Sequence, residues 1–157
     1  MYQYILEEGL YPLFYFKTKH GLEYFVSFQK MDFDNIFFQK LHSVDFYEAN
    51  NQKFFNDPLI EITITNIIND YFKSNPEIML NYVCDSVDFK QDFRQKLFDK
   101  WYRNTQNNEF SKINFQYQLD QENVVYHLSF IFKTEFYNIQ ELIEKVNLQL
   151  EEFSSFK

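Results

Sequence analysis

The segment from Asn75 to Arg103 places the strongest constraint on how this chain can fold. Asn75-Pro76 is followed by a short, nearly all-apolar run from Ile78 to Val83, which is typical of a central β-strand. A polar stretch from Cys84 to Asp88 comes next, and an amphipathic segment continues from Phe89 to Arg103. This pattern predicts a strand that leads through a tight acidic turn into a helix. Such turns often carry functional groups, because exposed backbone N–H groups and the helix dipole meet there, and they also carry ordinary helix caps.

The rest of the chain divides into further short elements. Runs rich in aromatic and β-branched residues predict strands, and Gly21 in the sequence Lys19-His20-Gly21 predicts a hairpin turn. With the central strand, the predicted strands cover residues 13–18, 22–31, 39–49, 78–83, 112–119 and 124–134. The element order βββ-α-β-α-ββ-α predicts an α+β fold, with helices packed on one largely antiparallel sheet. We expect a single domain over residues 1–157.

Local signals predict where the first and last helices begin. Asp57-Pro58 combines a capping residue with a proline at the first helical position. The alternation from Ile60 to Thr65 would also suit a strand, but the cap and the apolar spacing up to Asn75 favour a helix. The sequence Asn138-Ile139-Gln140-Glu141 is a capping box. It opens a last helix whose predicted apolar face comprises Ile139, Leu142, Ile143, Val146, Leu150 and Phe153.

The composition excludes several classes of site. The chain has 21 Phe and 12 Tyr but only 2 Gly, and it contains no glycine-rich phosphate-binding motif. Its net charge of −8 argues against sequence-independent binding to nucleic acid and against anionic membranes. Cys84 is the single cysteine, which excludes an intramolecular disulfide. With no signal peptide and no long apolar run, an acidic, aromatic-rich, cytoplasmic protein without cofactor is expected.

Two blocks of the sequence together resemble a known family. The first is the hairpin Tyr15-Phe16-Lys17-Thr18-Lys19-His20-Gly21-Leu22-Glu23-Tyr24-Phe25-Val26-Ser27-Phe28. The second runs from Asn75-Pro76 through Tyr82-Val83-Cys84-Asp85-Ser86 to Trp101. They resemble a domain-of-unknown-function family of small bacterial proteins, the family numbered 6169. The resemblance implies a compact bacterial domain and brings no activity or catalytic residue with it.

Asp85, Asp88, Gln91 and Arg94 form one polar cluster in the central block. On a helical wheel Arg94 falls between Trp101 and Phe98, on the core side of its helix. A guanidinium in that position needs an acceptor, and Asp85 is the nearest candidate. The favoured interpretation is structural, with Asp85 paired to Arg94 while Asp88 and Gln91 close a capping box. The functional alternative is a polar site for an anion or a metal.

Cys84 is the candidate nucleophile, activated by the helix that follows it. Its candidate bases are His20 in a turn and His42 and His127 in strands, which can reach it only through the fold. A lone cysteine after an apolar strand is more often a small buried side chain. No metal site is predicted, since metal-ligand motifs are absent and Asp32 and Asp34 are expected to be solvated. We likewise expect a solvated acidic face on the last helix, formed by Glu141, Glu144, Glu151 and Glu152.

Two functions of different classes follow from these observations. The favoured one is a non-catalytic protein-interaction module, an accessory or antitoxin-like or immunity-like subunit of a bacterial multi-protein system, whose partner is another protein and which can also self-associate. Its candidate contact residues are Phe33, Ile36, Phe37 and Phe38. The alternative is a small hydrolase or nuclease-like enzyme that uses Cys84, Asp85, Asp88 and Arg94 at the strand-to-helix turn.

Overall fold

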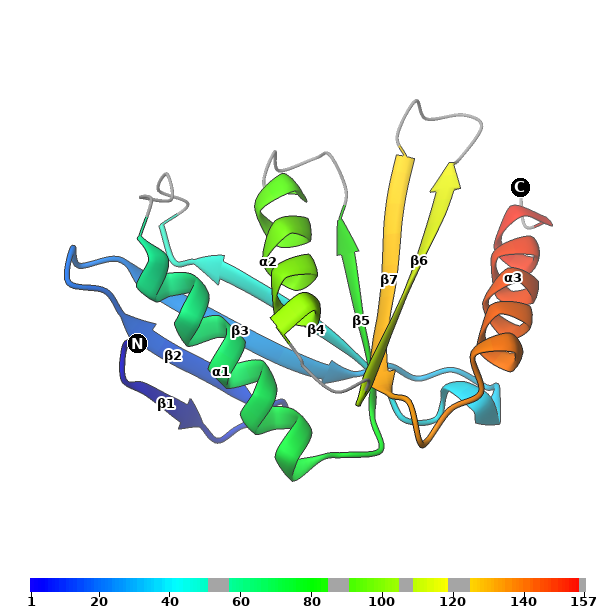
Figure 1. Ribbon diagram of the computed structural model, residues 1–157, viewed down its shortest axis with the longest axis horizontal. Helices are drawn as coiled ribbons and strands as arrows, with labels where there is room; N and C mark the ends of the chain where they lie inside the picture. The colour runs from blue at the N-terminus through cyan, green and yellow to red at the C-terminus, as the bar shows by residue number, and fades with distance from the viewer. Residues whose placement is uncertain (51–56, 85–90, 105–108, 119–124, 156–157) are drawn as a thin grey trace.

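The computed structural model describes residues 1–50, 57–84, 91–104, 109–118 and 125–155, which form an α+β fold (Figure 1). Within these residues one sheet of seven strands is packed against three α-helices and a short 3-10 helix. The strands are β1 (Tyr4–Glu7), β2 (Leu13–Lys17), β3 (Glu23–Lys30), β4 (Leu41–Glu48), β5 (Met79–Cys84), β6 (Phe110–Gln118) and β7 (Val125–Lys133). The helices are η1 (Ile36–Phe38), α1 (Pro58–Ser74), α2 (Gln91–Asn104) and α3 (Ile139–Ser155). No helix in these ranges is long and apolar enough to cross a membrane.

The strands follow the order β1-β2-β3-β4-β5-β7-β6, and every neighbouring pair is antiparallel except β4 and β5. The parallel pair arises because α1 forms the crossover between these two strands. Their ladder runs only from Leu41–Met79 to Ser43–Asn81. Figure 1 shows β4 and β5 close together at one end and diverging toward the other.

The predicted element order is confirmed, and the structure adds the short strand β1 ahead of it. None of the four residues of β1 is buried, and the strand belongs to the sheet through its pairing with β2. Its tertiary pairing therefore determines its conformation more than its own four residues do. Gly21 adopts a φ of 80° in the predicted hairpin turn between β2 and β3.

The segment with competing helix and strand patterns is helical. Asp57 caps α1 by accepting a hydrogen bond from the Leu59 backbone N–H at 3.0 Å, and Pro58 occupies the first helical position. The helix then buries its apolar stripe against the sheet. The buried side chains of that stripe include Ile60, Ile64, Ile67, Ile68, Tyr71 and Phe72.

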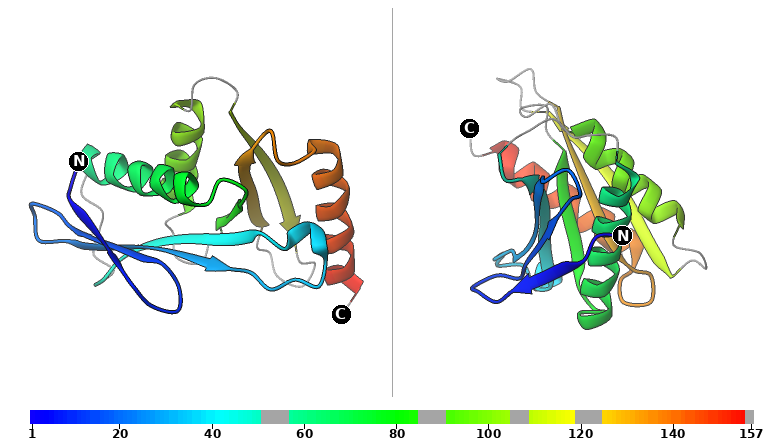
Figure 2. Two further views of the ribbon diagram at one scale, coloured as in Figure 1. Left: turned by 90° about the horizontal axis from the view of Figure 1, so that it is seen from below. Right: turned by 90° about the vertical axis from the view of Figure 1, so that its left-hand side faces the viewer.

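The sheet has a core on each face, because alternate residues of a strand point to opposite sides. Under α1 and α2 the core contains Val44, Phe46, Leu80 and Tyr82, and under η1 and α3 it contains Leu41, Met79 and Phe130. Figure 2 shows η1 beside α3, away from α1 and α2. The sheet therefore separates two packed layers, each with its own helices.

Side-chain burial follows the apolar pattern of the sequence at most described positions. Leu41, Val44 and Phe46 are buried in β4, and Leu97 and Trp101 are buried in α2. Ile139 is the exception on the last helix, with 40% of its surface exposed although it was expected on the apolar face. It is the first residue of α3, and the packed stripe begins one turn later with Leu142.

Candidate active site

Arg94 lies on the core side of α2, as the helical wheel predicts. Only 14% of its side chain is exposed, and its guanidinium lies 5.8 Å from the centre of the Phe46 ring. Among the described residues it forms an ion pair with Asp45 of β4, at 3.5 Å. Asp85 and Asp88, the acidic members of the predicted cluster, lie outside the described residues. Gln91 is placed by its backbone as the first residue of α2.

Cys84 is the last residue of β5, and the sheet places it opposite a histidine. The β5–β7 ladder pairs Cys84 with His127, and the β6–β7 ladder pairs His127 with Gln116. Residues directly opposite in antiparallel strands lie on the same face, with Cβ atoms about 4.5–5.5 Å apart. Cys84, His127 and Gln116 therefore form one row across three strands, which we call the Cys84 row. The structure describes the backbone position of Cys84 and not its side chain.

The Cys84 row lies on the face of the sheet that carries α1 and α2. Leu80 and Tyr82, on alternate positions of β5 before Cys84, belong to the core on that face, and so does Ile131 of β7. His127 is half-buried and Gln116 is exposed, so this end of the row is reachable from solvent. The backbone register thus places Cys84, His127 and Gln116 side by side on adjacent strands at the end of β5.

A hydrogen-bonded polar network occupies the neighbouring row of the sheet. Ser129 donates its hydroxyl to Asn114 Oδ1 at 2.6 Å, and Lys112 Nζ donates to the same oxygen at 3.0 Å. Lys112 is almost fully buried, with 4% of its side chain exposed, and also forms an ion pair with Asp99 of α2. Its ammonium lies 5.9 Å from the centre of the Tyr82 ring. This network fixes β6, β7 and α2 relative to one another beside the Cys84 row.

The other two histidines lie elsewhere in the sheet. His20 occupies the turn between β2 and β3, and His42 is opposite Leu80, four residues before Cys84. Burial lowers the pKa of His42, whose Nδ1 lies 3.1 Å from the Lys40 carbonyl oxygen. Of the three candidate bases, His127 is therefore the one that the fold places next to Cys84.

The candidate contact residues of the interaction module occupy the segment around η1. Phe38 is buried, Phe33 and Phe37 pack partly against the core under α3, and Ile36 is exposed. Asn35 caps η1 through a hydrogen bond from the Phe37 backbone N–H at 2.9 Å. This cap turns the segment so that Phe38 points inward, which leaves Ile36 as its most exposed apolar side chain.

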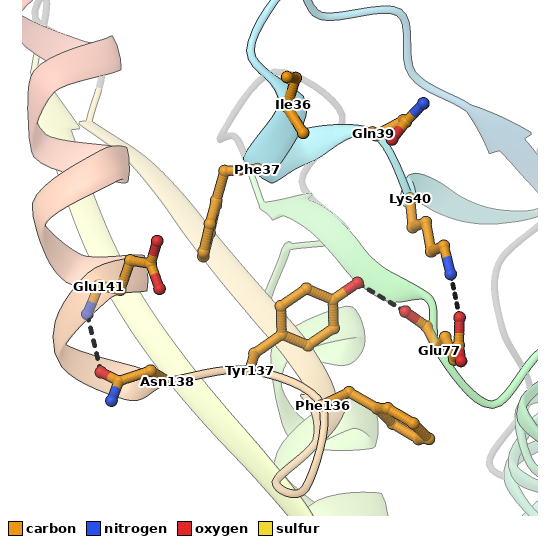
Figure 3. A pocket seen from close by; sticks show the side chains of 9 residues that line it. All are labelled: Ile36, Phe37, Gln39, Lys40, Glu77, Phe136, Tyr137, Asn138 and Glu141. Carbon is orange, nitrogen blue, oxygen red and sulfur yellow. Dashed lines mark hydrogen bonds and ion pairs between the residues drawn. The ribbon is translucent and has the colours of Figure 1, made fainter.

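A depression of about 420 Å³ lies between η1 and the start of α3 (Figure 3). The Tyr137 hydroxyl donates to the Glu77 backbone carbonyl at 2.5 Å, and the Glu77 carboxylate forms an ion pair with Lys40. Asn138 Oδ1 accepts the Glu141 backbone N–H at 3.0 Å, which confirms the predicted cap. Burial raises the pKa of Tyr137. Because these polar groups bond mainly to one another, the depression offers few groups that could bind a ligand or take part in catalysis.

Acidic side chains make no metal site within the described ranges, where no three His, Cys, Asp or Glu residues converge. Asp32 and Asp34 are exposed on the loop before η1. Glu141, Glu144, Glu151 and Glu152 are exposed along α3. These residues are surface charges in the structure.

Comparison with known proteins places the chain in a family. The model of DUF6169, a family of unknown function, matches residues 56–147, which is more than half of the chain. The chain belongs to this family. The match includes the central block and all three members of the Cys84 row. No curated protein matches this DUF6169 chain.

A solved structure described as a "putative phosphinothricin N-acetyltransferase" is similar to the DUF6169 chain at 14% sequence identity. The TM-score is 0.48, and the similarity covers 78% of this chain and 71% of that one. The predicted non-catalytic interaction module is contradicted by this finding, and we withdraw that prediction. The similarity transfers no activity and no residue to this chain.

Sequence reasoning identified Cys84 and His127 as candidates but missed Gln116. A β-strand glutamine carries no local signal of a role, and Gln116 becomes a candidate only through its place opposite His127. The hairpin of β6 and β7 could have suggested that pairing. The pairing of β7 with β5 joins segments that are far apart in the sequence, and no local pattern indicates it.

Proposed function

We propose that this DUF6169 protein is a small hydrolase that uses Cys84 as its nucleophile and His127 as its general base. The observation that supports the proposal is the register of the sheet, which pairs Cys84 with His127 and His127 with Gln116. A thiol next to an imidazole that is itself oriented by a third polar group is the arrangement that activates a cysteine. The proposal keeps the strand-to-helix turn as the location of the chemistry.

The chemistry suited to these groups is cleavage of an acyl bond. His127 takes the thiol proton of Cys84, and the thiolate attacks the carbonyl carbon of the substrate. The new C–S bond forms as the bond to the leaving group breaks, and the imidazolium returns its proton to that group. Water, deprotonated by His127, then attacks the thioester, which releases the acid and restores the thiol.

Gln116 would orient the base. Its carboxamide oxygen can accept a hydrogen bond from one imidazole nitrogen of His127, which leaves the other nitrogen to accept the thiol proton. Gln116 and His127 are direct partners in the β6–β7 ladder, so the two side chains need no rearrangement of the sheet to meet. We therefore assign Gln116 a positioning role.

Of the two enzyme classes that the sequence suggested, the acyl hydrolase is the better supported. A thiol–imidazole pair attacks carbonyl carbon, whereas nucleases need cationic groups or metal ions to hold a polyanion. The chain carries a net charge of −8. A polyanionic substrate is therefore disfavoured.

The single cysteine makes the proposal directly testable, because alkylation by iodoacetamide then reports on Cys84 alone. A free thiol has a pKa near 8.5 and is only about 1% ionised at pH 6.5. We expect the native protein to react about tenfold or more faster at pH 6.5 than the urea-unfolded protein does. His127→Gln should remove this enhancement, and His20→Gln, which changes a histidine in an exposed turn, should retain it.

Activity is the second measurement. Hydrolysis of p-nitrophenyl acetate should be lost in Cys84→Ala and His127→Gln and reduced in Gln116→Leu, with folding of each variant checked by circular dichroism. Native alkylation no faster than that of the unfolded chain would overturn the proposal. Ester hydrolysis that survives in a folded Cys84→Ala variant would overturn it equally.

A further inference from the structure

The face of the sheet opposite the Cys84 row holds a cavity of about 240 Å³. It lies between β4, β5 and β7 on one side and η1 and α3 on the other, and its wall includes Phe38, Leu41, Phe130, Val146 and Leu150. Its position follows from the alternation along β5, since Asn81 lines it while Tyr82 faces α2. The cavity is thus separate from the proposed catalytic residues.

One buried polar side chain reaches this apolar cavity. Asn81 is 7% exposed, and its Nδ2 lies 3.5 Å from the Ser129 carbonyl oxygen, which is a long hydrogen bond. A carboxamide has two N–H donors and an oxygen with two lone pairs, so this one long bond leaves Asn81 able to bond to a ligand in the cavity.

Water does not suit the cavity. A buried water molecule generally makes about three hydrogen bonds. Asn81 and Gln149 are the polar residues of the wall, and the Gln149 amide lies 3.4 Å from the Glu152 carboxylate. The remaining wall is aliphatic or aromatic, which favours an organic ligand over solvent.

We propose that this cavity binds a small, uncharged and largely apolar molecule with one hydroxyl or N–H group that donates to Asn81. The size of the cavity sets the size of the ligand, because an apolar cavity of about 150 Å³ binds benzene. A volume of about 240 Å³ suits a bicyclic aromatic molecule or a medium-length aliphatic chain. Access would lie beside Gln149 and Leu150, which are partly exposed.

A matched pair of probes tests both the cavity and its polar group. 2-Naphthol carries a hydroxyl donor, and 2-methoxynaphthalene has the same rings without the donor. Titration of the full-length protein, followed by ligand fluorescence, should show saturable 2-naphthol binding and about tenfold weaker binding of the ether. Asn81→Leu should reduce that difference to less than about twofold. Absence of 2-naphthol binding up to millimolar concentration would overturn the proposal.

Two tryptophan substitutions on α3 locate the site. Leu150→Trp puts a large side chain at the cavity wall and should abolish 2-naphthol binding. Leu148→Trp makes the same change at an exposed position outside the wall and should leave the affinity within about twofold of the wild type. Leu128→Phe fills the cavity from β7 and serves if Leu150→Trp does not fold. Undiminished binding in a folded cavity-filling variant would show that the ligand lies elsewhere.

Discussion

Phe98 of α2 stacks face to face on Tyr82 of β5, with ring centroids 3.8 Å apart and an interplanar angle of 10°. The same ring lies 6.0 Å from Phe46 of β4. β4 and β5 are hydrogen-bonded only as far as Ser43 and Asn81, so Phe98 contacts both strands where they have separated. The stack therefore joins the two parts of the sheet through α2.

Phe98→Ala should be strongly destabilising, because it removes a buried ring from contact with both strands at once. Truncation of a buried phenylalanine costs about 3–5 kcal/mol. Urea unfolding followed by circular dichroism would measure the loss in the free energy of unfolding. Phe136→Ala, at a position 39% exposed, is the matched control and should cost less than about 1 kcal/mol. Equal losses in the two variants would show that Phe98 has no special place in the fold.

A second prediction concerns the contact between α1 and α2. The Trp101 indole N–H donates to Asn69 Oδ1 at 3.0 Å, and Trp101 is almost fully buried. Asn69→Ala should leave this N–H without its partner, at a cost of about 1–3 kcal/mol. Asn66→Ala removes an amide from the same helix whose bond is only to the Ile62 carbonyl, and should cost less. Thermal unfolding of both variants, with Trp101 fluorescence as the probe, would rank them.

The elements that the sequence predicted well are those with signals in neighbouring residues. Asp57-Pro58 fixes the start of α1, and Gly21 fixes the hairpin turn, because caps and turns depend on the local backbone. Arg94 shows what signals in neighbouring residues can and cannot predict. Its helical position predicted its burial, and Arg94 also forms an ion pair with Asp45, on a strand distant in the sequence, that no local pattern indicates. The predicted pair with Asp85 involves a residue outside the described ones and stays a prediction.

The candidate site depended on information that local patterns do not contain. A shift of one residue in the pairing of β5 with β7 would move Cys84 and His127 to different neighbours, and nothing in either strand alone fixes that register. The sequence did not indicate the apolar cavity either, because its wall combines residues from η1, β4, β5, β7 and α3. Both features arise from tertiary packing.

Gly21→Ala should destabilise the protein through its backbone conformation alone. At a φ of 80° a Cβ atom is disfavoured, although an added Cβ would meet no atom within 4 Å. The expected cost is about 1–2 kcal/mol. Gly9→Ala is the control. Gly9 does not have a positive φ, and its added Cβ would lie 3.9 Å from the Tyr11 carbonyl oxygen, which is an ordinary contact. Chemical unfolding that finds both variants as stable as the wild type would contradict this role for Gly21.

Asp57 links the N-terminal segment to α1 in a pH-dependent way. Its Oδ2 accepts the Tyr2 hydroxyl at 2.5 Å, while its Oδ1 accepts the Leu59 N–H. The hydrogen bond from Tyr2 is the main cause that lowers the pKa of Asp57 from its ordinary value of 3.8. A carboxyl whose pKa is lower in the folded state contributes stability above its ordinary pKa, and this contribution is lost as the pH falls through the folded-state value.

Tyr2→Phe should therefore reduce the stability of the protein more at pH 6 than at pH 2.5, because it removes the bond that favours ionised Asp57. Urea unfolding across this range should give two curves of free energy against pH that converge at the acidic end. In the same variant, an NMR titration should show the pKa of Asp57 moving up toward 3.8. Tyr11→Phe changes an exposed tyrosine and should follow the wild-type curve. Parallel curves for Tyr2→Phe and the wild type would mean that the Tyr2 hydroxyl does not set the ionisation of Asp57.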